Sequence, residues 1–536
     1  MSPSPAGVSV PAADDAAGQS NAVIVTSRAL SVPAYFSGSG AILLVIALTI
    51  FGVFVPALIV PYAFSDDYPV LSIADGLGSS PWFGKNIVDT VAASGRPFAG
   101  LLDQLFFSTA GTIDNLRFVR LFAVVGIVAL ALLLHWALVR SGIKPTVAAL
   151  IAVLVCSMPA FQVYGSWAVL FNVPYAALLG GGASVLAVAA VDAPRSLVLD
   201  RLQGATALLL AALLVYQPAA MFFWVFLAVA LVGAVNDSGR ALRLARTHFG
   251  IAAVALALAF LVVKLAVHVV GQAAPNPERN SLTHDPIGKI SWFFHGPLYW
   301  SLNLFDLTPS RWLAALVATV AAVGILLGLR HRRARPLPYV AIALALIPLS
   351  FLPSLVVTEN SPTYRVLVSL SSLMALYACL GALGIWLAVR DWLKPRVSHE
   401  ALLASSRLAL AVSVVFVAAS AFLAAKNVTT LVVEPQSTEL RMIRSQVAAL
   451  PAGVARVGFV QIGWNQGFAK RIISDEFVPS SARPWTGEPA LLLILREEGR
   501  LPPEGQRPTV DILPWYTTTF PRNEPVVDLR GLQRLG

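Results

Sequence analysis

Charged residues are scarce in this chain. Only 12% of its 536 residues are Asp, Glu, Lys or Arg, whereas 57% are hydrophobic. The mean hydropathy of +0.74 is far above that of a soluble globular protein. The chain has 2 cysteines, Cys156 and Cys379, both within apolar runs, which excludes a disulfide framework and a zinc site of the usual spacing. These shortages predict a polytopic α-helical membrane protein.

The chain also lacks the features of a nucleic-acid-binding or nucleotide-binding protein. Its net charge of +10 comes from basic residues in short loops between apolar segments, which is typical of membrane topology signals and indicates no nucleic-acid partner. The run Gly180-Gly181-Gly182 matches neither phosphate-loop pattern and lies within an apolar span, where it predicts helix packing or a kink. Residues 1–39, rich in Ala, Ser, Pro and Gly, predict a disordered cytoplasmic tail rather than a signal peptide.

The apolar runs predict a transmembrane domain over residues 40–426. About eleven segments are long enough to cross roughly 30 Å of hydrocarbon. Residues 203–235 are divided at Tyr216-Gln217-Pro218, because proline cannot continue a helix. The candidate segments are 40–63, 117–140, 146–164, 168–191, 203–217, 218–235, 248–270, 312–329, 337–357, 366–389 and 407–425.

Basic residues recur in every second loop and set the predicted orientation. With the N-terminus inside, the five loops that carry the basic clusters beginning at Arg140, Arg195, Arg240, Arg330 and Arg390 all lie on the cytoplasmic side. Residues 64–116, 271–311, 358–365 and the C-terminal region then lie outside. The arginine-rich and alanine-rich composition is typical of a GC-rich bacterial genome, so we expect a multi-pass protein of the bacterial inner (cell) membrane, in contact with its lipids.

The predicted outer regions contain structure of their own. In the first outer loop, 84–94 and 97–107 have helical periodicity and predict interfacial helices, and 286–306 is rich in aromatic residues that favour the headgroup level. Residues 427–536 predict a small extracytoplasmic α/β domain, with a helix at 437–450 and β-like runs at 454–462, 490–495 and 509–513. Its aromatic residues are either core residues or sugar-stacking platforms: Trp464, Trp485, Trp515 and Tyr516.

An acidic pair, Asp66 and Asp67, follows directly after the first apolar run. A carboxylate at membrane depth costs roughly 2.5 to 3.5 kcal/mol, so acids at this depth predict a functional site. The alternative is that both acids cap an interfacial helix or mark the membrane boundary.

Transfer of a sugar from a polyprenyl-phosphate donor needs a base for the acceptor hydroxyl and cations for the departing phosphate, but no nucleotide-binding fold. The acidic pair supplies candidate bases. The candidate phosphate ligands are Arg96, Lys264, His268 and Arg365, and the candidates for sugar or acceptor binding are Tyr216, Gln217 and Glu359, with Asn172 and Tyr175 at neighbouring helix ends. Snorkelling or headgroup anchoring is the alternative for the cations.

The motif Ser65-Asp66-Asp67-Tyr68 resembles the signature of the integral-membrane (GT-C) glycosyltransferases. Together with Gly95-Arg96-Pro97, Tyr216-Gln217-Pro218 and Lys264, it resembles the type II glucosyltransferase (GtrII-like) family of O-antigen modification. The resemblance covers residues 40 to 425 and implies a GT-C-like fold and a glycan or lipid-linked acceptor. It also implies that Asp66 and Asp67 hold either the catalytic base or a divalent cation, Mg²⁺ or Mn²⁺. The large C-terminal region departs from the family and leaves the acceptor open.

Two other functions remain as alternatives. A transporter or flippase of lipid-linked sugars would need polar residues near mid-span and repeated halves, whereas the charges here cluster at helix ends. An outer polymer ligase or acyltransferase would use a loop histidine constellation, for which His284 and His295 are the candidates. Neither these histidines nor Asp285 has the spacing of a standard metal site.

Overall fold

The computed structural model describes residues 32–78, 84, 86–271, 277–279, 281–303, 310–332, 336–463, 475–503, 507–518, 520 and 524–535. Most of the predicted disordered tail, residues 1–31, lies outside the described residues, and the first helix, α1 (Val32–Ile59), begins within the rest of it. Phe305 and Trp464 of the predicted aromatic sets also lie outside the described residues.

A bundle of long apolar helices makes up most of the described chain. Eight described helices are long and apolar enough to cross a membrane, or nine if the pair α6 and α7, bent by 64°, counts as one span. The bundle consists of α1, α5 (Leu116–Arg140), α6 (Pro145–Cys156), α7 (Pro159–Ser166), α8 (Val173–Val191), α9 (Arg195–Val215), α10 (Gln217–Ala220), α11 (Phe222–Gly233), α12 (Ser238–Val270), α15 (Arg311–His331), α16 (Pro336–Leu349), α17 (Leu352–Val356), α18 (Tyr364–Leu393) and α19 (His399–Asn427).

All eleven predicted apolar segments contain helix. Two of them are shorter than a full span: Gln217–Gly233, which contains α10 and α11, and α16. The predicted break near Tyr216 is confirmed, because this residue has an extended backbone and Pro218 stands in the first turn of α10. The chain therefore enters the following apolar segment in a new direction.

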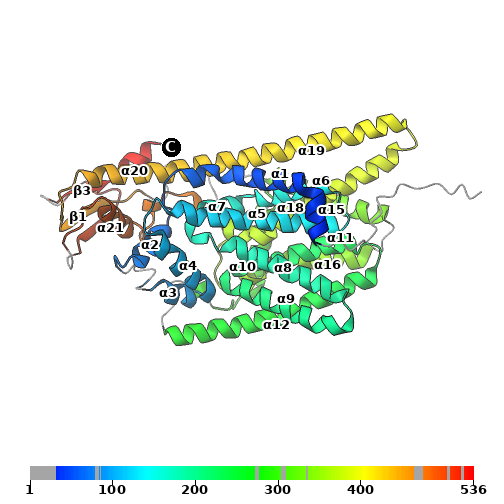
Figure 1. Ribbon diagram of the computed structural model, residues 1–536, viewed down its shortest axis with the longest axis horizontal. Coiled ribbons are helices and arrows are strands. Elements are labelled where there is room, and N and C mark those ends of the chain that lie inside the picture. The colour runs from blue at the N-terminus through cyan, green and yellow to red at the C-terminus, as the bar shows by residue number, and fades with distance from the viewer. Residues whose placement is uncertain are drawn as a thin grey trace, which may run out of the picture.

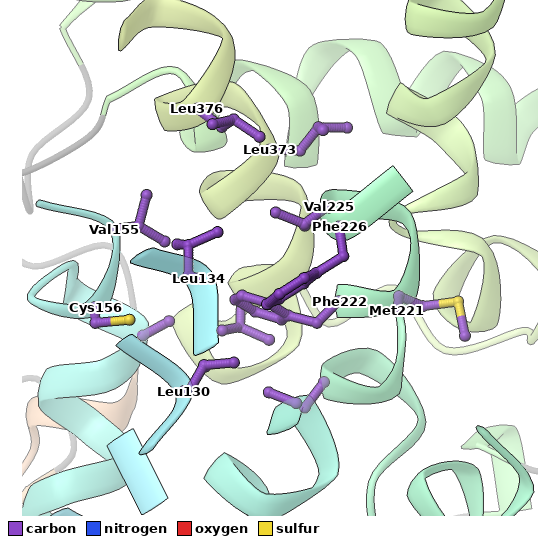
Figure 2. Packing of buried hydrophobic residues seen from close by; sticks show 14 of the residues in the cluster. Leu130, Leu134, Val155, Cys156, Met221, Phe222, Val225, Phe226, Leu373 and Leu376 are labelled. Atoms are coloured by element: carbon purple, nitrogen blue, oxygen red, sulfur yellow. The ribbon is translucent and has the colours of Figure 1, made fainter. Parts of the chain in front are cut away.

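The centre of the bundle is a continuous apolar core. Figure 2 shows side chains of four helices meeting there, among them Leu134 of α5, Val155 of α6, Phe222 of α11 and Leu373 of α18. Gly180 of α8 packs directly on α10, since a Cβ atom there would overlap the carbonyl oxygen of Ala220. The triple-glycine run is thus a helix-packing feature, as predicted.

Short helices lie at one end of the bundle, where Figure 1 shows α2 (Asp67–Ala74), α3 (Ile87–Ala93) and α4 (Pro97–Ala110). Two further short helices are α13 (Pro286–His295) and α14 (Pro297–Ser301). The predicted helices over 84–94 and 97–107 are confirmed as α3 and α4, and Pro97 at the start of α4 divides them.

The C-terminal domain packs at the same end, beside α2 (Figure 1). Its elements are α20 (Glu434–Ala448), β1 (Arg456–Val460), the short 3₁₀ turn Ser480–Ala482, α21 (Gly487–Glu497), β2 (Thr509–Leu513) and β3 (Val526–Asp528). The sheet has the order β2-β1-β3, and β1 pairs in parallel with both neighbours. A π-helical segment, Val428–Val433, joins α19 to α20 without a break, so that helix continues from the bundle into this domain.

The strand predicted at 490–495 is wrong. These residues lie in α21, where every side chain from Pro489 to Leu495 is buried. The run is rich in leucine rather than in β-branched residues, and a short apolar run that is buried all round has no periodicity to separate helix from strand. The third strand is β3, which the sequence analysis did not predict.

Candidate active site

A left-handed residue shapes the turn between α1 and α2. Among the described residues, Ser65 is the one non-glycine residue with a positive φ, at 50°. Its N–H donates to Oγ of Ser480, at 2.7 Å, and the helix α2 begins two residues later at Asp67. This turn gives the neighbouring acids different surroundings, because residues adjacent in sequence point apart.

Asp67 is fully buried and holds this turn together. Its Oδ2 accepts the N–H of Phe64 at 2.9 Å, and its Oδ1 accepts the N–H of Val169 at 2.8 Å. Burial raises the pKa of Asp67 to about 7, although the positive charge of Arg120 opposes this shift. Since both oxygens bind backbone donors, Asp67 is placed to fix the turn rather than to meet a substrate.

Arg120 of α5 is a buried cation that the sequence analysis did not single out. It donates to the carbonyl oxygens of Ala57, at 2.8 Å, and Tyr62, at 3.0 Å, and its guanidinium lies 3.9 Å from the centre of the Tyr62 ring. It thereby fixes the end of α1 and compensates the charge of Asp67. An arginine near the end of an apolar span is unremarkable in sequence, so only the contacts reveal it.

Asp66 is half-buried and has a different environment. Its Oδ1 accepts the indole N–H of Trp485 at 2.8 Å and the hydroxyl of Ser65 at 3.2 Å. None of the described residues donates a hydrogen bond to its Oδ2. Asp66 is therefore the member of the pair whose carboxylate can accept a proton from a substrate hydroxyl.

Aromatic rings and arginines connect Asp66 with Arg365. The guanidinium of Arg365 lies 5.0 Å from the centre of the Trp167 ring. The guanidinium of Arg483, which is buried, lies 5.7 Å from the centres of both Trp167 and Trp485. Because Trp485 also binds Asp66, the carboxylate and the two arginines form one contiguous site.

Glu476 positions Arg365 at the beginning of α18. Its buried carboxylate accepts the N–H groups of Tyr364, at 2.8 Å, and Arg365, at 3.1 Å. An oxygen of the same carboxylate lies 3.4 Å from Nε of Arg365, whose side chain is 17% exposed. Glu476 thus caps the helix and also orients the guanidinium.

Arg96 and Tyr216 extend the site toward α9 and α10. The guanidinium of Arg96 lies 4.6 Å from the centre of the Tyr216 ring, and Gln217 donates to the carbonyl oxygen of Gly95 at 2.6 Å. Burial lowers the pKa of Arg96, and the charges of Arg279 and Arg365 lower it further. These three arginines therefore form a basic cluster.

Glu359 neutralises part of this cluster. It pairs with Nε of Arg279 through both carboxylate oxygens, at 3.0 and 3.1 Å, and its carbonyl oxygen accepts Nζ of Lys289 at 2.7 Å. The structure thus brings together Arg96, Tyr216, Gln217, Glu359 and Arg365 of the predicted residues, with Arg279 and Lys289 as additions.

Asp103 is a third acid of the site that the sequence analysis missed. It is buried on the inner face of α4 and accepts a hydrogen bond from Asn172 at 2.9 Å. Burial raises the pKa of Asp103 well above its usual value, Arg96 opposes the rise, and Asp67 adds to it. Its neighbours on that face are Ala99, Gly100, Phe107 and Ala110. An acid within such an apolar stripe is the sequence signal that would have revealed it.

The structure does not bring Lys264 and His268 into this cluster. Both side chains are exposed on α12, and Lys264 lies 5.4 Å from the Phe260 ring of the same helix. No contact joins either residue to the acidic pair or to Arg365 in the described part of the chain. The snorkelling alternative describes their placement, because their side chains point away from the bundle.

The remaining polar candidates have local roles. Asp285 caps α13 by accepting the N–H of Gly288, and His295 lies 2.8 Å from the carbonyl oxygen of Ser291 in that helix. The hydroxyl of Tyr175 donates to the carbonyl oxygen of Phe122 at 3.0 Å.

The described residues do not fit a divalent cation held by protein ligands alone. They include no group of three His, Cys, Asp or Glu side chains arranged to hold a metal ion. Both oxygens of Asp67 bind backbone N–H groups, which leaves Asp66 as the carboxylate that the pair presents.

One solved structure similar to this one is the crystal structure of ArnT from Cupriavidus metallidurans bound to undecaprenyl phosphate. The two share 15% sequence identity and a TM-score of 0.38, over 87% of this chain and 90% of that chain. No curated protein matches the sequence.

A family model for glucosyl transferase GtrII matches residues 84–380, more than half of the chain. The matched range contains Arg96, Asp103, Tyr216 and Arg365. It begins after the acidic pair and ends before the C-terminal domain. The predicted family resemblance is confirmed: the chain belongs to the glucosyl transferase GtrII family.

Proposed function

We propose that this protein transfers a sugar from a polyprenyl-phosphate-linked donor to a glycan or lipid-linked acceptor of the cell envelope, on the extracytoplasmic face of the membrane. The observation that carries this proposal is the placement of Asp66. Its carboxylate is held on one side by Trp485 and lies at the junction of the apolar bundle and the C-terminal domain, close to a cluster of arginines. Family membership supports the transfer of a glycosyl group.

In the proposed reaction, Oδ2 of Asp66 takes the proton from an acceptor hydroxyl. The acceptor oxygen then forms a bond to C1 of the donor sugar. The bond between C1 and the phosphate oxygen breaks, and its electron pair leaves with the polyprenyl phosphate. The donor carries its own leaving group, so the chain needs only a base and groups that stabilise the developing negative charge.

The arginine cluster supplies those groups. Arg365 and Arg96 are oriented by Glu476 and Tyr216, so their guanidinium groups are arranged before a phosphate arrives. Oriented cations of this kind stabilise the charge that develops in the transition state. The loss of one such donor typically raises the activation barrier by about 2.7 to 4 kcal/mol. The polyprenyl chain would remain among the apolar helices, whose exposed side chains face the membrane.

The donor specificity of the reconstituted protein tests this proposal. Purified protein in proteoliposomes is given a panel of radiolabelled polyprenyl-phosphate sugars, beginning with glucose because of the family, together with envelope glycans of the host as acceptors. We expect transfer by the wild type and a rate lower by roughly 10² to 10⁴-fold for Asp66→Asn at comparable protein levels. Movement of the labelled lipid across the bilayer without any transfer would instead identify a flippase.

A further inference from the structure

We infer that the C-terminal domain completes the active site, with Trp485 as the positioning residue for the Asp66 carboxylate. This inference rests on the proposed role of Asp66 as the base. It assigns a part in the reaction to a domain outside residues 84–380, the range that matches the family.

The first support is the geometry at Oδ1 of Asp66. The indole N–H of Trp485 donates to this oxygen at 2.8 Å, although the two residues are 419 positions apart in the sequence. The hydroxyl of Ser65 donates to the same oxygen at 3.2 Å. Two donors on one oxygen fix the plane of the carboxylate, so Oδ2 is presented in one orientation to the acceptor hydroxyl.

The second support is that the same domain holds the turn on which Asp66 stands. Oγ of Ser480 accepts the N–H of Ser65 at 2.7 Å. Ser480 is itself fixed, because its hydroxyl donates to Gln436 at 2.7 Å and its N–H donates to Glu439 at 2.9 Å. A left-handed serine is uncommon and persists only where its surroundings hold it.

Ser480 and Trp485 both lie next to packed elements of the domain. Ser480 begins a 3₁₀ turn, and Trp485 lies two residues before α21, whose apolar residues are buried. The two contacts to the acidic turn therefore come from one packed unit of the C-terminal domain rather than from a free loop. The hydroxyl of Ser480 accepts a hydrogen bond from the turn and the indole of Trp485 donates one to it, so the domain orients the base without being part of the helical core.

The decisive variant is Trp485→Phe, which removes the N–H and keeps most of the ring. A hydrogen bond to a charged group is worth about 1.5 to 3 kcal/mol, so we expect kcat to fall roughly 10-fold to 100-fold. KM for the lipid donor should stay within about twofold, since the donor phosphate binds elsewhere. Trp515→Phe is the matched control, because Trp515 is an exposed tryptophan of the same domain, and it should keep the wild-type kcat.

A double-mutant cycle separates positioning from general stabilisation. If Trp485 acts through Asp66, Trp485→Phe should cost nothing further in an Asp66→Asn background. Additive losses, or a wild-type kcat for Trp485→Phe alone, would overturn the inference while leaving the proposed function intact. Full transfer by Asp66→Asn would instead overturn the proposed function.

Discussion

Asp67 accepts the backbone N–H of Val169 at 2.8 Å, and this bond ties the turn after the first helix to the segment that precedes α8. Its neighbour Asp66 accepts a hydrogen bond from Trp485 of the C-terminal domain. Two adjacent acids of the same type thus have different contacts, Asp67 with backbone N–H groups of the bundle and Asp66 with the C-terminal domain. The first prediction concerns this division.

We expect Asp66→Asn to lower transfer by roughly 10² to 10⁴-fold with a wild-type melting temperature, because it removes the proton acceptor and little else. Asp67→Ala should lower the melting temperature, because two buried N–H groups lose their acceptor. Each buried group left without a partner destabilises the fold by about 1 to 3 kcal/mol. Transfer assays, donor binding and thermal unfolding in detergent give the three readouts. Active Asp66→Asn with inactive Asp67→Asn would reverse the assignment.

The second prediction is a pH dependence of stability. Burial raises the pKa of Asp67 from 3.8 in a model compound to about 7. Between these two values the folded protein binds more protons than the unfolded chain, so stability falls as the pH rises from about 4 to about 7, by up to about 1.4 kcal/mol per pH unit. Lowering the pH from about 7.5 to about 5 should therefore raise the melting temperature of the wild type.

Asp67→Asn is the control for that measurement, because an amide does not titrate. As the pH falls, the melting temperature of the wild type should rise relative to that of Asp67→Asn. A difference that stays constant with pH would show that the Asp67 carboxylate does not titrate in this window.

A third prediction distinguishes the clustered cations from the exposed ones. Arg365→Gln should lower turnover by at least about 10²-fold with normal protein levels in the membrane, because Arg365 is oriented toward the proposed phosphate site. Lys264→Met should retain near-normal transfer, because Lys264 is exposed on α12. An equal loss of turnover in both variants would show that Lys264 also contributes to phosphate binding, and the donor would then have to bind in a different position.

Asp103 gives a fourth prediction. Burial raises the pKa of Asp103 well above its usual value and so favours the neutral carboxyl, and its Oδ1 accepts the side-chain N–H of Asn172. Asp103→Asn preserves a neutral group with an acceptor oxygen, so transfer at neutral pH should remain within a few-fold of the wild type. Asp103→Leu leaves the buried amide of Asn172 without its partner and should lower both stability and transfer. A severe loss of transfer in the Asn variant alone would show that the charged form of Asp103 is needed.

The fifth prediction tests the orientation. In a Cys379→Ala background, cysteines introduced at Ser281 and Thr518 should react with impermeant thiol reagents added outside intact cells, and one at Asn236 should not. All three positions are exposed. External labelling at Asn236 would place the acidic pair on the cytoplasmic side.

The sequence predicted the helical segments well because a bilayer requires long apolar runs, and proline marks the break near Tyr216. The short run at 490–495 was assigned wrongly because it is buried on all sides in α21. The acidic pair and Arg365 were found by chemical type and position. The different contacts of Asp66 and Asp67 were not predictable, since their partners Trp485 and Val169 lie 419 and 102 residues away in the sequence.

Arg120 and Asp103 were missed for a related reason. Each is an ionisable residue in an apolar helix, which marks its position in the sequence, but the buried partners that it meets are known only after folding. Lys264 and His268 show the opposite case. Their spacing of four places both on one side of α12, but sequence spacing alone does not say whether that side faces the protein or the membrane.

One continuous helix, from α19 through the π-helical segment into α20, connects the bundle to the C-terminal domain. This rod runs over 50 residues, from His399 to Ala448. A residue inserted into an α-helix rotates everything beyond it by roughly 100°. A single insertion or deletion in Val428–Val433 would therefore swing Trp485 away from Asp66 without altering either residue.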